Sequence, residues 1–240
     1  MAQPLFPDLL AILARCDTNT VCNAIEVVQG SRGFQGFTRF TPMASSERPF
    51  FGRARTATIR GRERPVEATG VLRNRRMDYY RHIATGPRAD CPAVAVIQDL
   101  DAAQDGRGGV GAFWGEINAA IHRGFGLTGA LTNGVMRDLG DLPPDFPVVA
   151  GSVGPSHGWV HVREIGVPVM VLGLSVRDGD FVHADRHGAV VVPEPVLPAL
   201  GAGIEKLWRT ERIVLDATRE ESFDFARFET AWEAFEKART

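Results

Sequence analysis

An arginine and an aspartate stand side by side where a buried strand is expected to end. Arg137 and Asp138 follow the apolar stretch "GALTNGVM", residues 129–136. Neighbouring residues of a strand point to opposite faces of a sheet, so the pair is either a surface turn or a site in which each side chain reaches a different group. A guanidinium binds carboxylates through paired hydrogen bonds, and a carboxylate is a ligand for hard cations. A site here would therefore suit chemistry on a negatively charged substrate.

A second group of candidates lies shortly before this pair. The stretch "WGEINAAIHRG", residues 114–124, has apolar residues at helical spacing, and the helix is expected to begin near Gly115. The first amides of a helix have no intrahelical acceptor and carry the positive end of the helix dipole, so an anion such as a substrate carboxylate could bind there. Glu116 would then be a metal or water partner, provided that the following strand returns alongside. The alternative is that Glu116 only complements the dipole.

The glycine-rich stretch "GFGLTG", residues 124–129, matches the G-x-G-x-x-G pattern of dinucleotide-binding proteins. It follows a helix and leads into a strand, which is the reverse of the context that this pattern requires. We therefore predict no phosphate site here. Gly124 is expected to end the helix, and Gly126 and Gly129 to form a tight connection.

The elements that must position these residues alternate between helix and strand. Helices are expected over residues 6–16 and 18–30, with Thr18 capping the second and Gly30 ending it. An irregular loop follows over residues 31–51. Strands are expected over 52–61, 92–100, 127–136 and 146–154, with a run of short strands over 163–194.

Composition narrows the classes of function. The chain has 240 residues, 44% of them hydrophobic, which is enough for a substantial core. The net charge of −2 gives no electrostatic footprint of a nucleic-acid-binding protein, although basic residues gather in "LRNRRMDYYR". No apolar stretch reaches the length of a membrane span, and we expect a cytoplasmic protein with a small-molecule partner. The three cysteines, Cys16, Cys22 and Cys91, are expected to be reduced.

The last part of the chain is expected to form two amphipathic helices. Leu197, Leu200, Ile204 and Leu207 share a helical spacing, and so do Phe225, Phe228, Trp232 and Phe235. Their apolar stripes must cover either the protein's own core or a neighbouring subunit. We therefore divide the chain into an α/β core, residues 1–195, and a helical extension, residues 196–240.

These stretches together resemble a known family. "GEINAAIHRGFGLTGALTNGVMRD", residues 115–138, is similar to the signature of the RraA-like family, which includes divalent-metal 4-hydroxy-4-methyl-2-oxoglutarate / 4-carboxy-4-hydroxy-2-oxoadipate aldolases. Residues 16–30, 146–156 and 167–193 resemble further family segments in the same order. The resemblance spans roughly residues 10–195. It implies a three-layer swivelling α/β core with a mixed sheet, assembled as a homotrimer or homohexamer with sites at subunit interfaces.

The resemblance also implies roles for individual residues. Asp138 would coordinate Mg²⁺ or Mn²⁺, Arg137 would bind the substrate's carboxylate or carbonyl oxygen, and Glu116 would hold a metal-bound water. Family aldolases take a further glutamate from the C-terminal part of an adjacent subunit, and Glu211 is the nearest candidate. The pyruvyl carboxylate would bind to the backbone amides of Gly115, Glu116, Ile117 and Asn118.

The residue types suit this chemistry. Cleavage of a carbon–carbon bond beside a 2-oxo acid produces the enolate of pyruvate, whose developing negative charge a divalent cation stabilises. A Schiff-base aldolase would need a lysine, and no lysine stands in this group of residues. We therefore expect a metal-dependent pyruvate aldolase that also decarboxylates oxaloacetate. A metal-activated water assisted by Glu116 is our hypothesis for the base.

Alternatives are kept for the function and for three further residues. The family also contains non-catalytic proteins that bind and inhibit a ribonuclease, and this is the alternative function. Asn23 stands where the family usually has an aspartate, and we assign it no catalytic role. His157 and His161 could shape a substrate pocket or be ordinary surface or core histidines, and Asp185 could bind metal or close a turn.

Overall fold

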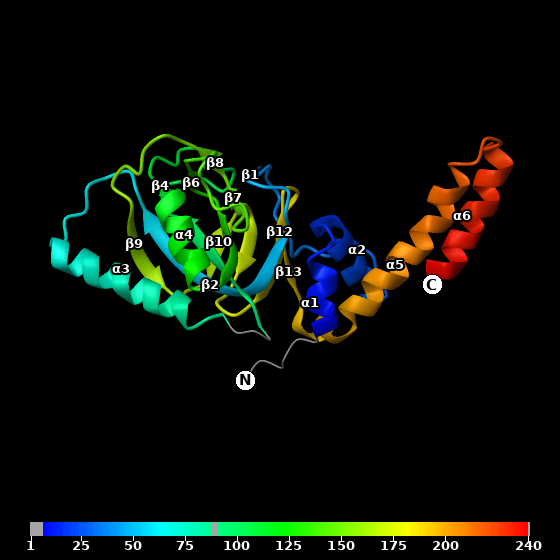
Figure 1. Cartoon of the computed structure of the whole chain (residues 1–240), viewed down its shortest axis with the longest axis horizontal. Helices are drawn as coiled ribbons and strands as arrows, with labels where there is room; N and C mark the ends of the chain where they lie inside the picture. The colour runs from blue at the N-terminus through cyan, green and yellow to red at the C-terminus, as the bar shows by residue number, and fades with distance from the viewer. Residues whose placement is uncertain (1–6, 88–90, 240) are drawn as a thin grey trace.

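The chain forms an α/β fold around one large mixed sheet, shown in the computed structural model of Figure 1. The structure describes residues 7–87 and 91–239. The sheet is eight-stranded, and β9 (His161–Ile165) joins it by pairing with β2. The other strands lie in the order β1 (Met43–Ala44), β7 (Val148–Ala150), β5 (Leu127–Thr132), β3 (Ala93–Asp99), β2 (Phe50–Arg60), β12 (Phe181–Asp185) and β13 (Gly188–Val192).

The middle of the sheet is parallel and its edges are antiparallel. β2, β3, β5 and β7 pair in parallel, whereas β1, β9, β12 and β13 pair antiparallel with their neighbours. β2 is long enough to pair with β12 through its first half and with β9 through its second half. Most residues of β2 and β3 are buried, as expected for parallel strands that are covered on both faces.

A small parallel sheet contains the short strands that directly follow two strands of the main sheet. It consists of β4 (Ala112–Trp114), β6 (Val135–Met136) and β8 (Ser152–Val153). The chain leaves β5 at Thr132 and enters β6 three residues later, and it leaves β7 at Ala150 and enters β8. The strand expected over residues 127–136 is therefore two strands in two sheets.

Two helices cover one face of the main sheet, α3 (Thr69–Ala84) and α4 (Glu116–Gly124). The core beneath them contains Tyr79, Ile83 and Trp114, all fully buried. The core on the opposite face forms around β10 (Val169–Val171) and β11 (Leu174–Val176), an antiparallel hairpin.

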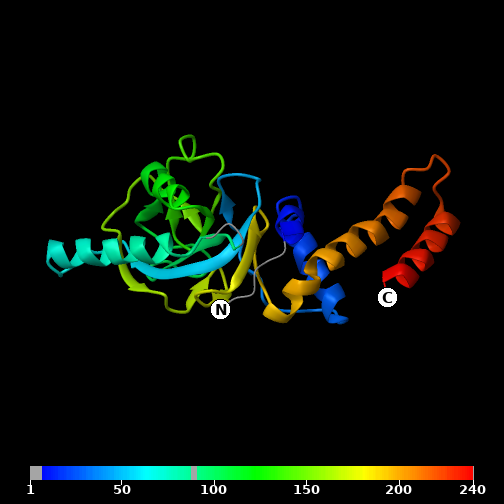
Figure 2. The same cartoon turned by 60° about the horizontal axis from the view of Figure 1, so that its bottom comes forward.

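The remaining helices form a unit on the β12–β13 side. α1 (Pro7–Leu13), α2 (Thr18–Gln29) and α5 (Leu197–Ala217), which follows the short helix η1 (Glu194–Val196), share a core with β12 and β13. α6 (Phe225–Arg239) folds back on α5, and the two make an arm that extends away from the sheet in both views (Figures 1 and 2).

The structure confirms the α/β class, the mixed sheet and the C-terminal helices, with differences in detail. α2 is capped by the Asp17 side chain, which accepts a hydrogen bond from the Thr20 amide, rather than by Thr18. Gly30 ends α2 with a φ of 65°, as expected. α3 is absent from the sequence prediction. Among the described residues, no helix combines the length and the apolar character that a membrane span requires.

Candidate active site

Arg137 and Asp138 converge on the start of α4. Both follow β6, and the Arg137 amide donates to the Trp114 carbonyl at 2.8 Å, which extends the pairing of β6 with β4. Asp138 has a φ of 57°, a left-handed conformation that aspartate tolerates better than most residues. The alternation of side chains between the two faces of a strand therefore does not extend through Arg137 and Asp138. Arg137 Nε lies 3.6 Å from Asp138 Oδ2, so the two side chains share one site instead of facing opposite sides.

Gly115 provides the space for this convergence. It is the N-cap residue of α4, as the sequence indicates. A Cβ atom at this position would lie 2.6 Å from Asp138 Oδ2 and 3.0 Å from Arg137 Nε. Any other residue would therefore push the arginine or the aspartate away. The need for glycine here is steric, because its backbone is extended with a φ of −151°.

The positive end of α4 faces the Asp138 carboxylate. Asp138 Oδ2 accepts a hydrogen bond from the Glu116 amide at 3.1 Å, which is the first amide of the helix. Helix geometry leaves the next amides, of Ile117 and Asn118, as donors for a ligand. Of the four backbone amides expected to bind the substrate carboxylate, the Glu116 amide is therefore already hydrogen-bonded to Asp138. The Glu116 side chain is exposed in the first turn.

The donor set fits a hydrated hard cation. Asp138 Oδ2 is engaged by the Glu116 amide, whereas Oδ1 has no hydrogen bond to any described residue. Within the described part of the chain, no three His, Cys, Asp or Glu side chains gather as a metal cluster. Mg²⁺ keeps several waters and needs only one or two carboxylates from the protein. Asp138 could hold such an ion directly, with Glu116 reaching it through water.

Glu211 does not join this group within one chain. It lies on α5, in the arm, near Arg15 and Trp208. Burial raises the pKa of Glu211, and Asp17 adds to the shift while Arg239 opposes it. Its assignment as a ligand from a neighbouring subunit remains a prediction.

A buried polar network supports the turn between β5 and β6. The Asn133 side chain accepts a hydrogen bond from the Asp99 amide at 2.8 Å and donates to the Asp99 carbonyl at 3.0 Å. A Cβ atom at Gly134 would lie 2.9 Å from the Asp99 Cβ, so a larger residue in this turn would require Asp99 to shift. Burial raises the pKa of Asp99. This network fixes the position of β6, which Arg137 follows.

Beside the pair lies a cavity of about 530 Å³ with three walls. One wall is the start of α4 with β4 and Arg137. The second is one face of α3, and the third is the segment 157–162. The residues from α3 recur at helical spacing and are Thr69, Leu72, Arg73, Arg76 and Tyr80.

Both histidines of residues 157–162 line this cavity. The Nδ1 atom of His157 is 2.7 Å from the Gly158 carbonyl, and that of His161 is 2.7 Å from the Trp159 carbonyl. Each carbonyl can only accept, so Nδ1 carries the proton in both rings. Their location therefore agrees with a role in shaping the pocket.

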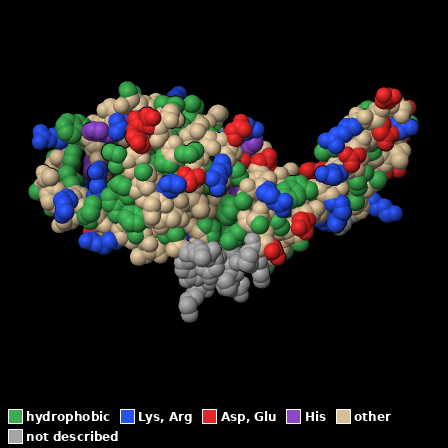
Figure 3. Space-filling view, viewed as in Figure 1, with side chains coloured by type: hydrophobic (Ala, Val, Ile, Leu, Met, Phe, Trp, Pro, Cys, Tyr) green, Lys and Arg blue, Asp and Glu red, His purple; other side chains and the backbone are tan. Residues whose placement is uncertain are grey.

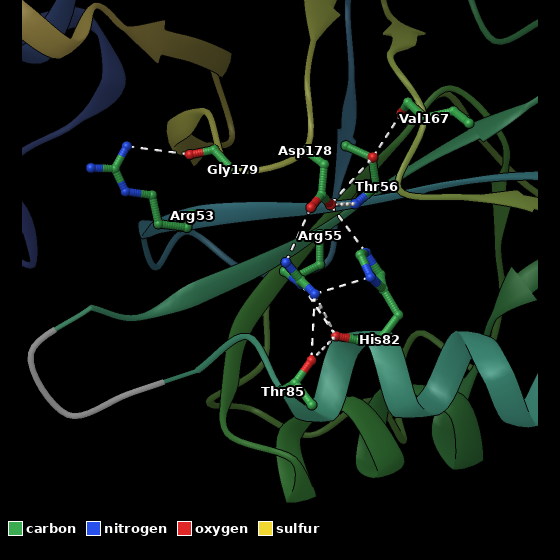
Figure 4. A network of polar contacts seen from close by, with 8 residues as sticks. All are labelled: Arg53, Arg55, Thr56, His82, Thr85, Val167, Asp178 and Gly179. Atoms are coloured by element: carbon green, nitrogen blue, oxygen red, sulfur yellow. Dashed lines mark hydrogen bonds and ion pairs between the residues drawn. The ribbon is translucent and has the colours of Figure 1, made fainter. Parts of the chain in front are cut away.

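The α3 wall is held in place by a polar network at the end of the helix (Figure 4). Asp178 Oδ1 lies 3.0 Å from His82 Nε2 and accepts from the Thr56 amide at 2.9 Å, while Asp178 Oδ2 accepts from Arg55 at 3.1 Å. Arg55 also donates to the His82 carbonyl at 2.8 Å. Burial alone would raise the pKa of Asp178, but these hydrogen bonds and the charge of Arg55 hold it below its usual value.

Sequence reasoning missed the contribution of α3. The basic stretch "LRNRRMDYYR" contains Arg73, Arg76 and Tyr80, but its sequence was interpreted only as a concentration of positive charge. Trp159, between the two histidines, was also missed. The recurrence of Leu72, Arg76 and Tyr80 at intervals of four was the signal that could have placed them on one helical face.

Comparison with known proteins decides the family. A family model described as RraA-like, Aldolase/RraA, matches residues 18–191. The chain belongs to the RraA-like family. This family includes both aldolases and ribonuclease inhibitors, its members often use a divalent metal, and its proteins are oligomeric. No curated protein matches the chain.

Solved structures share the RraA-like fold. An uncharacterized protein from Pseudomonas syringae pv. tomato str. DC3000 is 20% identical with a TM-score of 0.68, over 97% of this chain and 96% of that one. RraAS2 from Streptomyces coelicolor, an unusual member of the RNase ES inhibitor RraA protein family, is 18% identical with a TM-score of 0.63, over 92% of this chain and all of that one. At these identities the likeness establishes the fold alone.

Two features of this RraA-like chain lie outside the site. Asp185 accepts hydrogen bonds from the amides of His187 at 2.8 Å and Thr18 at 2.9 Å, so it closes a turn and binds the first amide of α2. In "GFGLTG", α4 ends at Gly124 and Gly126 has a φ of 87°. A Cβ atom at Gly129 would lie 2.4 Å from the Phe50 ring, so this glycine serves close packing.

Proposed function

We propose that this protein is a metal-dependent lyase that cleaves a 4-hydroxy-2-oxo acid to pyruvate and also decarboxylates oxaloacetate. The observation that carries the proposal is the convergence of Arg137 and Asp138 on Gly115 at the start of α4. It joins a carboxylate whose Oδ1 has no hydrogen bond to a described residue, a guanidinium and helix amides beside a cavity. Membership in the RraA-like family, which includes aldolases, supports it.

The substrate's oxo-acid end is bound by this chain's own donors. Arg137 lines the cavity and offers a fixed pair of N–H groups to the carboxylate or the keto oxygen. The amides of Ile117 and Asn118 add hydrogen bonds with the favourable dipole of α4. These contacts place the bond to be cleaved next to Asp138.

A divalent ion held by Asp138 would stabilise the negative charge that develops on the keto oxygen. Arg137 contributes to the same stabilisation through charge-assisted hydrogen bonds. Glu116 is exposed in the first turn of α4, where its amide binds Asp138, and is the group that takes the proton of the C4 hydroxyl, directly or through a water. The enolate of pyruvate is common to aldol cleavage and to oxaloacetate decarboxylation, so one site serves both reactions.

Glu116→Gln tests the proton transfer. We expect turnover to fall by about 100-fold, which is within the usual contribution of a general base. The Michaelis constant should change little, because the Glu116 amide still donates to Asp138. Full turnover in this variant would exclude Glu116 as the base.

The function itself is tested by pyruvate release from 4-hydroxy-4-methyl-2-oxoglutarate and from oxaloacetate. We expect release with Mg²⁺ or Mn²⁺, its loss after chelation and its return when metal is added. Release that persists after chelation would contradict the metal-dependent mechanism. Release from neither compound would exclude these two short acids as substrates, and partner capture would then test the ribonuclease-binding alternative.

A further inference from the structure

The cavity beside Arg137 has a cationic wall that the proposed chemistry does not use. Arg73 and Arg76 lie on the face of α3 that lines the cavity, and both are exposed. Neither has an ion pair with a described residue. Their neighbours on the helix differ, because Arg75 pairs with Glu67 at 3.3 Å and Arg81 pairs with Asp78. Two guanidinium groups are therefore left for a ligand.

Among the described residues, no carboxylate lines the cavity opposite these arginines. Its lining in the described part of the chain includes Arg73, Arg76 and Arg137 but no Asp or Glu. Basic and histidine side chains gather at the end of the molecule where α3 and β9 lie, at the left of Figure 3. Low-dielectric walls strengthen such a field, so the cavity favours a ligand that is negatively charged at more than one point.

The space between the charged walls is aromatic. Tyr80, Phe113 and Trp159 line it together with aliphatic residues. Tyr80 is fixed, because its hydroxyl donates to Asn118 Oδ1 at 3.1 Å and the Asn118 side-chain amide donates to the Phe113 carbonyl at 2.8 Å. Arg64 lies over the Trp159 ring, 5.7 Å from its centroid. Phe113 is buried, whereas Trp159 is 52% exposed. Aromatic walls of this kind suit a flat apolar group.

The cavity is also larger than a short dicarboxylic acid requires. Its volume of about 530 Å³ falls within the range typical of pockets that enclose an organic ligand with apolar parts. A substrate that reached from Arg137 to the α3 arginines would fill it. A short acid would leave the aromatic part to water.

We propose that the substrate is a 4-hydroxy-2-oxo acid with a flat apolar group at C4 and a second carboxylate beyond it, which Arg73 and Arg76 bind. This inference rests on the proposed function for its oxo-acid end. A suitable substrate is 4-(4-carboxyphenyl)-4-hydroxy-2-oxobutanoate. Its C3–C4 bond breaks, the electron pair stays on C3, which takes up a proton to give pyruvate, and the C4 hydroxyl loses its proton to give 4-formylbenzoate.

Binding is measured first, with analogues that lack the C4 hydroxyl and cannot be cleaved. We titrate 4-(4-carboxyphenyl)-2-oxobutanoate and 2-oxo-4-phenylbutanoate into the full-length protein with Mg²⁺, by calorimetry. The carboxylated compound should bind about 10- to 100-fold more tightly, as expected for hydrogen bonds between charged groups. In the double variant Arg73→Gln/Arg76→Gln the ratio should fall to about one, whereas Arg81→Gln, on the same helix, should keep it.

Equal affinities in the wild type, a preference that survives in the double variant, or no binding of either analogue would overturn the inference. Pyruvate release from the two corresponding 4-hydroxy compounds and from 4-hydroxy-4-methyl-2-oxoglutarate is measured in parallel. A binding preference without release from any of them would contradict the lyase function and leave the anion site standing. Release with equal affinities would support the lyase and reject the second anion site.

Discussion

At the scale of single residues, the site depends on backbone positions that restrict which side chains can be present. Asp138 turns its carboxylate toward α4 through a positive φ, and Gly115 leaves room for it. The apolar run before Arg137 and Asp138 left a surface turn and a site as alternatives, and the resemblance to the RraA-like family implied a shared site with the amide of Gly115. The sequence pattern could not predict their convergence, since strand alternation implies opposite directions and the positive φ follows from tertiary contacts.

Gly115→Ala tests this steric requirement. The added methyl group would displace Asp138 or Arg137, and a misplacement of about 1 Å can cost about 100-fold in rate. We expect pyruvate release to fall by at least about 10-fold, with little change in melting temperature because alanine tolerates the extended backbone. Gly124→Ala is the control, since a Cβ atom there meets nothing within 4 Å. Equal activity of the two variants would contradict the assignment.

At the scale of elements, the contact between α3 and α4 determines the shape of the cavity. His122 of α4 is fully buried, its Nε2 atom lies 2.6 Å from the Tyr79 hydroxyl of α3, and its Nδ1 atom lies 2.6 Å from the Asn118 carbonyl. Nδ1 must therefore carry the single proton of a neutral ring, and Tyr79 donates to Nε2. Burial lowers the pKa of His122 to about 4, although the Asn118 carbonyl opposes this shift.

This geometry predicts a loss of stability in mild acid. The unfolded chain takes up a proton on His122 below pH 6.5, whereas the folded protein does so only near pH 4. The stability that neutral His122 provides is therefore complete above pH 6.5 and falls as the pH drops toward 4, by about 3 kcal/mol.

Denaturant unfolding of wild type and His122→Gln checks this prediction at several pH values. The variant should be less stable at pH 7, and the difference should shrink between pH 6.5 and 4. His157→Gln, at an exposed position, should follow the wild type. A difference between wild type and His122→Gln that stays constant with pH would show that the protonation of this histidine is not linked to folding.

The elements themselves were predictable to different degrees. β3 and α4 could be located because a continuous apolar run and a helical stripe are strong signals. α3 could not, because it buries only Tyr79 and Ile83 and turns its arginines to the cavity and solvent. The division of residues 127–136 into β5 and β6 depends on Asn133, whose side chain bonds to the backbone of Asp99 across the fold. The periodicity of the sequence cannot predict a contact between residues so far apart in the chain.

At the scale of the whole molecule, the arm carries an aromatic surface that the described residues leave exposed. Phe225 is 74% exposed and Trp232 is 42% exposed on α6, which packs chiefly on α5. The family is oligomeric, and exposed aromatic clusters are typical of subunit interfaces. We therefore expect the arm, within the proposed extension 196–240, to contact a neighbouring subunit of a trimer or hexamer.

Phe225→Ser/Trp232→Ser tests the role of the arm. Loss of two aromatic contacts per subunit should lower the mass measured by light scattering toward that of the single chain, 26.1 kDa. Val66→Ser is the control, because Val66 is 98% exposed in a loop of the core. An unchanged mass for the arm variant would place the interface elsewhere, and Glu211 would then lose its predicted route to a neighbouring site.

The central claim, a metal-dependent lyase site at Asp138, is tested most directly by the Mg²⁺ dependence of pyruvate release in wild type and Asp138→Asn. Asparagine tolerates the positive φ and its carbonyl oxygen can still accept the Glu116 amide, so the fold should be preserved while the negative charge is lost. We predict release that saturates with Mg²⁺ in the wild type and falls by at least about 100-fold in the variant at equal melting temperature. Equal release by both proteins at every Mg²⁺ concentration would contradict the account.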